Sequence, residues 1–126
     1  MIILYTVIAA ALIWLVNKQV MNLLGNKAII VAVPFIEELI KTSSAVFFQV
    51  PLIALHGLFG VIEAFLDLIN GQEFMPALAA CFGHLIFGII TVLLMDRFGF
   101  WGAWFLVSIV HMFWNYLVVS MIMLNR

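Results

Sequence analysis

The chain has 126 residues, of which 67% are hydrophobic and only 9% are charged, with a mean hydropathy of +1.30. Soluble domains carry about 45–50% apolar and about 25% charged residues, so the composition excludes an ordinary soluble fold and indicates an integral membrane protein. The net charge of −1 excludes the basic surface that nucleic-acid binding requires. We expect a single transmembrane domain, residues 1–126, in the lipid bilayer of the cell membrane, with no nucleic-acid partner.

Five long apolar runs are separated by short polar stretches. The runs cover Ile2–Val16 with an extension toward Leu24, then Ala28–Val50, Pro51–Ile69, Met75–Met95 and Phe100–Leu124. The polar stretches are Gly25-Asn26-Lys27, Asn70-Gly71-Gln72-Glu73 and Asp96-Arg97-Phe98-Gly99. About 20 apolar residues span a bilayer as a helix, and backbone polar groups cannot stay unpaired in hydrocarbon. We therefore expect an all-α integral membrane protein, a multi-pass bundle of about five transmembrane helices.

The charges at the ends of the runs suggest how the bundle is oriented. Alternating spans place three basic residues on one membrane side and Arg97 on the other. The three are Lys18, Lys27 and Arg126. Because cytoplasmic loops are enriched in lysine and arginine, we expect residues 17–27 and 70–74 to face the cytoplasm, with the amino terminus outside.

The second run contains two adjacent carboxylates and a lysine, within Glu37-Glu38-Leu39-Ile40-Lys41. These groups lie roughly ten residues deep in a segment of transmembrane length. Together with Glu63 and Asp67 of the third run, they would cost on the order of 12–17 kcal/mol if left unpaired in hydrocarbon. Net stabilities are only about 5–15 kcal/mol. We therefore expect these groups to be paired, neutralised or hydrated, and we take them as a candidate functional site.

Polar residues from four runs fall at one depth in the membrane. At about 1.5 Å per helical residue, their distances from polar residues at the same membrane side are roughly 15 Å for Glu37, 10 Å for Glu63, and 16 Å for His84 and Asn115. His111 lies about one turn further in. We expect the glutamates of the second run, with the glutamate and histidines at this depth, to face a common interior cavity.

Helix geometry gives the two adjacent carboxylates different neighbours. Glu37 and Lys41 stand at i and i+4, the favourable order for an ion pair. Glu38 points about 100° away and is expected to approach another neighbour. A purely structural alternative is that Lys41 only neutralises Glu37 for insertion, which leaves Glu38 unexplained. Two carboxylates in a low-dielectric site disfavour each other's ionisation, so one can hold a proton while the other acts as a base.

Three histidines and an asparagine complete the set of candidate polar residues. His111 and Asn115 stand one turn apart and can donate hydrogen bonds to one oxyanion, although a hydrogen bond between helices would also explain them. His84 is at the depth of the cluster, whereas a lone buried histidine is more often structural. His56 lies nearer the opposite surface, and we expect it at the membrane interface.

A metal site is the less favoured interpretation of the same residues. Carboxylates and imidazoles are zinc ligands, and four of them are available. They are Glu37, Glu63, His84 and His111. No local HExxH motif supports a zinc site, so we expect no cofactor.

Three motifs, taken in order, resemble those of the CPBP superfamily. They are Glu37-Glu38-Leu39-Ile40-Lys41, Phe59-Gly60-Val61-Ile62-Glu63 and His111-Met112-Phe113-Trp114-Asn115. That superfamily contains the type II CAAX proteases, bacteriocin-processing and immunity proteins, and the related PrsW-type proteases, and its usual motifs are EExxxR, FxxxH and HxxxN. With EExxK and FxxxE, this chain is nearest to a minimal PrsW-like member, and the resemblance covers residues 34–118.

The resemblance implies a glutamate-dependent intramembrane endopeptidase. By analogy, Glu37 would activate water, and His111 and Asn115 would hold the oxyanion. Glu63 stands where the CAAX branch has histidine, which leaves the proton-transfer partner open, with His84 as a candidate for part of that role. The chain is shorter than the usual members and has fewer spans.

We therefore expect a hydrolase in which an activated water attacks a peptide bond of a membrane-associated protein or peptide. Glu38 or Glu63 would share protons with Glu37. Two alternatives from other classes stay open: a non-catalytic membrane scaffold or binding protein, and a proton-coupled transporter that uses the same buried groups. Small residues at Gly57/Gly60 and Ala79/Gly83 favour close helix contact, which suggests a homodimer.

Overall fold

The computed structural model describes residues 1–71 and 73–124, without the side chains at 26, 27 and 122–124. Gln72 of the predicted turn and Arg126 of the predicted cytoplasmic side lie outside this description. Every element in the described part is helical. The elements are α1 (Ile2–Leu24), the 3₁₀ turn η1 (Asn26–Ile29), α2 (Ala32–Phe47), α3 (Leu52–Ile69) and α4 (Phe74–Leu124).

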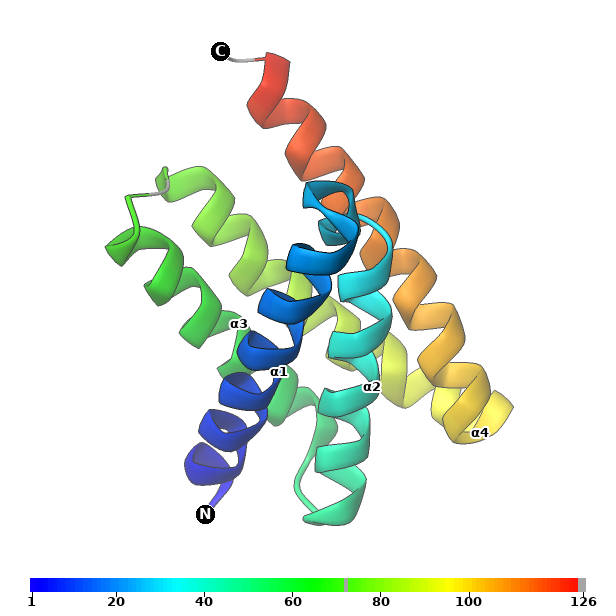
Figure 1. The fold of residues 1–126 in the computed structure, drawn as a ribbon. Coiled ribbons are helices and arrows are strands. Elements are labelled where there is room, and N and C mark those ends of the chain that lie inside the picture. Colours follow the sequence, from blue (N-terminus) through cyan, green and yellow to red (C-terminus); the bar gives the residue numbers. More distant parts are fainter. Residues whose placement is uncertain (72, 125–126) are drawn as a thin grey trace.

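The 51-residue element α4 is interrupted by one non-helical residue, Gly99, with φ 67° and ψ −176°. That region of φ/ψ space is accessible almost only to glycine. Figure 1 shows the consequence: the chain runs down to the reversal and then back up toward the carboxyl terminus. The predicted turn at 96–99 is therefore a single glycine that joins a first arm, 74–98, to a second arm, 100–124.

Three of the helices are long and apolar enough to cross a membrane. They are α1, α3 and the 48-residue stretch Phe74–Met121 of α4. The expected count of five such helices is not met, for two reasons. The second run is helical over only the 16 residues of α2, because residues 26–29 form the 3₁₀ turn, and the two arms of α4 are counted together as one helix although the chain reverses between them at Gly99. The all-α class is confirmed.

Helix α2 is the middle of the fold, in contact with α1, α3 and α4. Its buried positions recur every three or four residues, as an inward face of a helix requires. They are Val33, Pro34, Glu37, Glu38, Lys41, Thr42 and Ala45. Pro34 lies in the first turn, where the missing N–H has no intrahelical partner to lose.

Helix α3 and the first arm of α4 approach closely at two glycines. A Cβ on Gly60 would lie 2.9 Å from the Cβ of His84, and a Cβ on Gly88 would lie 2.8 Å from the Cβ of His56. Each histidine thus packs against a glycine of the facing helix. A Cβ on Gly83 would likewise lie 2.8 Å from Nε1 of Trp114 in the second arm. Gly60 and Gly83, whose small size suggested a homodimer, make their close contacts with other helices of the same chain. The homodimer stays a prediction.

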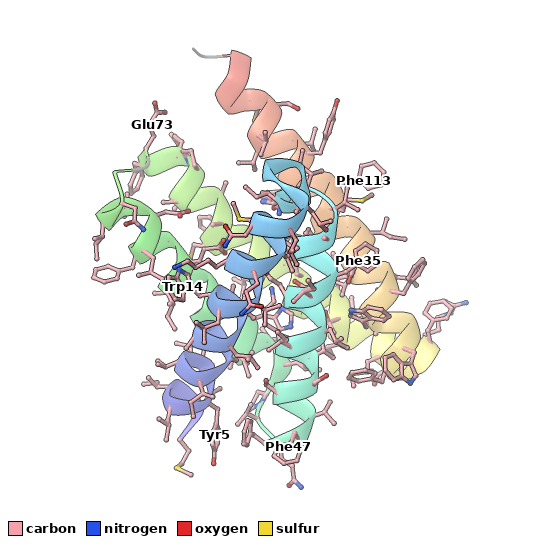
Figure 2. The ribbon with its side chains drawn as sticks, in the orientation of Figure 1. Tyr5, Trp14, Phe35, Phe47, Glu73 and Phe113 are labelled. Carbon is pink, nitrogen blue, oxygen red and sulfur yellow. The ribbon has the colours of Figure 1, made fainter. Side chains whose placement is uncertain are left out.

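The outer surface of the bundle is apolar on every long helix. Leucine, isoleucine and phenylalanine side chains are more than half exposed on several faces, among them Leu4, Phe65, Leu93 and Phe113. Figure 2 shows Phe47 and Phe113 pointing away from the bundle. A contiguous apolar exterior of this extent is typical of a protein that lies in lipid.

We predict that Gly60→Ala destabilises the fold by about 1–3 kcal/mol, because the new Cβ would overlap the backbone of Cys81 as well as His84. Gly57→Ala is the matched control on the same helix, since its Cβ would meet only Leu85 Cδ1 at 3.5 Å. Both substitutions gain the same helix propensity, so their difference measures packing. The measurement is the unfolding midpoint in mixed micelles with increasing dodecyl sulfate. Equal midpoints for the two variants would contradict the close approach.

Candidate functional site

The centre of the polar cluster is the carboxylate of Glu38, which is fully buried. Its Oε1 accepts hydrogen bonds from Lys41 Nζ at 2.6 Å and from His111 Nδ1 at 2.9 Å. Lys41 is also fully buried. Two opposite charges removed from water must be paired with each other and with further hydrogen bonds to be tolerated, and both conditions are met here.

The main partner of Lys41 differs from the expected one. The sequence predicted an i,i+4 pair with Glu37, whereas Nζ lies 3.9 Å from Glu37 Oε2 and 2.6 Å from Glu38 Oε1. Residues at i and i+3 also share a helix face, so Glu38 can reach the lysine. The lysine is drawn further into the bundle by His84, whose Nδ1 accepts a hydrogen bond from Nζ at 3.0 Å, and it lies over the ring of Phe59.

Glu37 faces α1 instead of the lysine. Its Oε1 accepts a hydrogen bond from Asn17 Nδ2 at 2.8 Å. Its Oε2 lies 3.9 Å from both Lys41 Nζ and His111 Nε2, which is too far for a hydrogen bond. One oxygen of this carboxylate is therefore held in place, and the other is free to accept a proton or a hydrogen bond.

The hydrogen-bond network fixes the tautomer of His84. An ammonium has no acceptor, so Lys41 Nζ must donate to His84 Nδ1, and the ring proton then sits on Nε2. Nε2 in turn contacts Glu63 Oε2 and donates to it. Lys41, His84 and Glu63 thus form a chain that leads from the buried centre to the partly exposed carboxylate of Glu63.

The same reasoning gives the tautomer of His111. A carboxylate can only accept, so Nδ1 carries the proton that is donated to Glu38. Nε2 then has a free lone pair, directed toward Glu37 Oε2 at 3.9 Å. The ring is stacked on Phe87, with centroids 4.5 Å apart, which holds its plane.

Asn115 has a different partner from His111. Its Nδ2 donates a hydrogen bond to the backbone oxygen of Ile29 in η1 at 3.1 Å, which ties the second arm of α4 to the entry of α2. The two side chains predicted to hold one oxyanion together thus have separate partners in this structure. Asn115 keeps a second amide N–H, and its side chain lines a cleft that leads to the cluster.

This cleft reaches the cluster from one end of the bundle. One part of it, about 440 Å³, lies among α1, α2 and α3, and a second part, about 220 Å³, lies beside α4. The two parts share Ile29, Glu63, Asp67 and Asn115. Glu37 lines the first part, and His84 and His111 line the second. The catalytic candidates therefore border these two neighbouring spaces, except Glu38, which is fully buried behind them.

His56 is fully buried, not interfacial as the sequence suggested. Its Nδ1 lies 3.6 Å from Glu38 Oε2. His56 shares one face of α3 with Gly60, one turn later, and with Glu63, two turns later. It lies inward because this face packs against the first arm of α4. The i, i+4, i+7 spacing of His56, Gly60 and Glu63 was the available signal for this.

The structure brings all six predicted site residues together. They are Glu37, Glu38, Glu63, His84, His111 and Asn115, from α2, α3 and both arms of α4. Two further residues contact the cluster and were not among the predicted site residues, namely His56 and Asn17. For Asn17 the only signal is that a polar residue follows the apolar run of α1 at about the depth of Glu37.

Three donors could approach a metal ion, namely Glu37, His84 and His111, whose ligand atoms lie within 4.8 Å of one another. The arrangement of His84 does not suit a metal. Its two nitrogens are engaged by Lys41 and Glu63, and the lysine ammonium 3.0 Å from Nδ1 would repel a bound cation. Zinc also requires its ligands at about 2.0–2.2 Å, which would break these contacts. These three residues therefore do not fit a metal ion.

Comparisons with family models, with curated proteins and with solved structures find no match for this chain. The resemblance to the CPBP superfamily therefore stays a prediction from three motifs. Any functional conclusion must rest on the geometry of the cluster itself.

We predict that Lys41→Met destabilises the fold by about 3–5 kcal/mol, because it leaves the buried carboxylate of Glu38 without its cation. The double variant Lys41→Met, Glu38→Gln should recover a large part of that loss. Lys18→Met, at an exposed lysine of α1, is the control and should cost less than about 1 kcal/mol. Unfolding in mixed micelles measures all three. A Lys41→Met loss no larger than that of the control would contradict the buried pair.

Proposed function

We propose that this chain is a glutamate-dependent intramembrane endopeptidase in which Glu37 activates a water molecule. The observation that carries the proposal is the pair formed by Glu37 Oε2 and His111 Nε2. These two atoms lie 3.9 Å apart and both are hydrogen-bond acceptors. Two acceptors that face each other need a donor between them.

A water molecule fits this need. It can lie about 2.8 Å from each atom and donate one O–H to each. Both hydrogens are then engaged, and the lone pairs of the oxygen stay free to attack. An electrophile that enters along the cleft would meet this oxygen, because Glu37 and His111 line the two connected parts of the cleft.

The reaction is a hydrolysis. The water oxygen forms a bond to the peptide carbonyl carbon, the carbonyl π pair moves to its oxygen, and Glu37 takes the proton. The second amide N–H of Asn115, which lines both parts of the cleft, is available as a donor to the resulting oxyanion. Protonated Glu37 then delivers the proton to the departing amine as the C–N bond breaks, which regenerates the carboxylate.

The remaining residues of the cluster position Glu37 and His111. Glu38 fixes the tautomer and the plane of His111 and is itself neutralised by Lys41. Asn17 holds one oxygen of Glu37 so that the other faces the cleft. Glu63 and His84 link the lysine to the cleft, which offers a route for returning a proton. This division resembles the roles that the CPBP-like motifs imply, with His111 assigned here to the water.

We also propose that the chain crosses the cell membrane five times. Each arm of α4 has about 25 residues, roughly 37 Å of helix, which is enough for one crossing. Helix α2 spans roughly 24 Å and is completed by η1 and residues 48–51. Figure 1 shows the successive segments running in alternating directions, and Figure 2 shows Glu73 at the same end as the carboxyl-terminal end of α4.

Single-cysteine labelling tests the five crossings. In a Cys81→Ala background, Leu23→Cys and Glu73→Cys should react with an impermeant reagent from one side of a sealed vesicle, and Phe47→Cys and Phe98→Cys from the other. All four positions are exposed. Labelling of the Phe47→Cys and Leu23→Cys variants from the same side would contradict a crossing by α2.

A proton-coupled transporter is the competing proposal, and one observation favours it. Glu38 Oε2, Thr42 Oγ1 and both nitrogens of His56 are buried and have no hydrogen-bond partner among the described residues. Thr42 lies one turn after Glu38 on α2 and His56 lies near the start of α3, so these groups would extend the polar chain toward the opposite membrane face. A transporter requires that path to open, whereas the peptidase requires only the cleft.

We predict that Glu37→Gln lowers cleavage of a membrane peptide by about 10²–10⁴, because the amide keeps the size and the contact with Asn17 but cannot take a proton. Folding should be retained, since a neutral amide is less costly to bury than a carboxylate. Cleavage by the purified protein, with thermal stability recorded alongside, measures both.

Two controls accompany that experiment. Glu73→Gln makes the same chemical change at an exposed site and should keep full activity. Addition of a chelator should leave the rate unchanged, whereas a zinc enzyme would lose activity. Equal cleavage by wild type and Glu37→Gln would end the glutamate mechanism, and proton flux through vesicles without any cleavage would favour the transporter.

A further inference from the structure

We infer that the cleft binds a cationic side chain, a lysine or arginine of the polypeptide substrate, between Glu37 and the mouth of the cleft at Asp67. That the bound polypeptide is a substrate rests on the proposed function, whereas the binding site itself is argued from the lining and the charge of the cleft. It adds a specificity determinant, Asp67, that takes no part in the hydrolysis itself.

Among the residues that line the cleft, Asn115 keeps one amide N–H, and the other groups without a hydrogen-bond partner among the described residues are acceptors. Asn17 lines the cleft, and its buried Oδ1 has no such partner, because the amide nitrogen is directed to Glu37. The side chain of Glu37 is only 6% exposed, and its Oε2, to which the proposed water donates, makes no hydrogen bond with a described residue. An excess of acceptors toward the mouth of the cleft suits a ligand that brings donors, such as an ammonium or a guanidinium.

The charge of the cleft has the same sign throughout its described part. Three carboxylates line the 440 Å³ space, those of Glu37, Glu63 and Asp67, and none of its described lining residues is lysine or arginine. Glu63 and Asp67 stand one turn apart on α3, so the acidic wall runs from the cluster toward Asn70 at the end of that helix.

The size and the walls of the cleft favour a side chain over a bare ion. Its volume of about 440 Å³ is far larger than the roughly 30 Å³ that one water occupies in the liquid. Apolar side chains form much of the lining, namely Trp14, Met21, Ile29, Val33 and Leu66. Apolar walls that lead to carboxylates suit the methylene stem and charged head of lysine or arginine.

The mouth of the cleft lies at the membrane side where transmembrane substrates carry basic residues. Asn70 lies at the end of the bundle that also carries Lys18 of α1 and the α3–α4 turn, and the excess of basic residues assigns that end to the cytoplasm. Transmembrane segments carry lysine and arginine at their cytoplasmic flanks for the same reason. A substrate helix would thus present its basic flank to Asp67 while its peptide bond approaches Glu37.

The test uses three labelled transmembrane peptides that differ only at one flanking residue: lysine, its neutral isostere norleucine, or glutamate. Binding is measured by fluorescence anisotropy to the full chain in phosphatidylcholine nanodiscs, and cleavage is measured separately. We expect wild type to bind the lysine peptide about tenfold more tightly than the norleucine peptide and the glutamate peptide most weakly. Asp67→Asn should reduce that preference to within about threefold, and Glu73→Gln, at the same membrane side but outside the cleft, should retain it.

The outcomes separate this inference from the proposed function. A lysine preference that Asp67→Asn removes, without any cleavage, supports the cation site and ends the peptidase. Cleavage of the three peptides with equal KM overturns the cation site and leaves the peptidase standing. Equal binding of the three peptides, with a Mg²⁺-dependent shift that Asp67→Asn abolishes, would make an inorganic ion the occupant and would also overturn it. Asp67→Lys gives an independent check, since the preference should invert toward the glutamate peptide.

Discussion

The ion pair between Glu38 and Lys41 is the contact on which the rest of the site depends. Both side chains are fully buried in a chain whose exterior is apolar, so neither charge has water as an alternative partner. Further hydrogen bonds must then come from neighbouring helices. His84 and His111, from the two arms of α4, supply one each, and the pair thereby helps to determine where both arms pack against α2, while Glu38 Oε2 has no hydrogen-bond partner among the described residues.

Close approach of the helices makes these hydrogen bonds possible. A side chain as short as histidine can reach the centre of the bundle only if its own helix lies near, and glycine provides that distance. The spacing of four residues between His56 and Gly60 is repeated between His84 and Gly88, so that each histidine lies against the glycine of the opposite helix. Packing and polar chemistry are therefore encoded at the same positions, and a change at the glycines would move the histidines.

Much of this arrangement could be predicted from the sequence. Helical class follows from the lengths of the apolar runs, and the common depth of the polar residues follows from their distance to the polar turns. The partners of individual atoms could not be predicted, because the preference of Lys41 for Glu38 depends on His84, which is 43 residues away along the chain. The spacing of His56, Gly60 and Glu63 on α3 indicated that His56 is buried. The interfacial prediction relied instead on the position of His56 near the end of its span, and it was wrong. The single-residue reversal at Gly99 replaces a predicted four-residue turn, since hydropathy marks where a span ends and carries no information on backbone angles.

Two chemically identical residues at adjacent positions of α2, Glu37 and Glu38, have different surroundings and therefore different roles. A step of about 100° around α2 directs Glu38 into the closed centre and Glu37 toward α1 and the cleft. Glu38, with a cation at 2.6 Å, is stabilised as a charged and permanent acceptor, and this fixes the proton of His111 on Nδ1. Glu37, with no cation among the described side chains closer than 3.9 Å and with one oxygen held by Asn17, keeps an oxygen that can gain and lose a proton. A lysine one turn after both, held nearer to Glu38 with the help of His84, therefore makes one carboxylate structural and leaves the other free to act as a base.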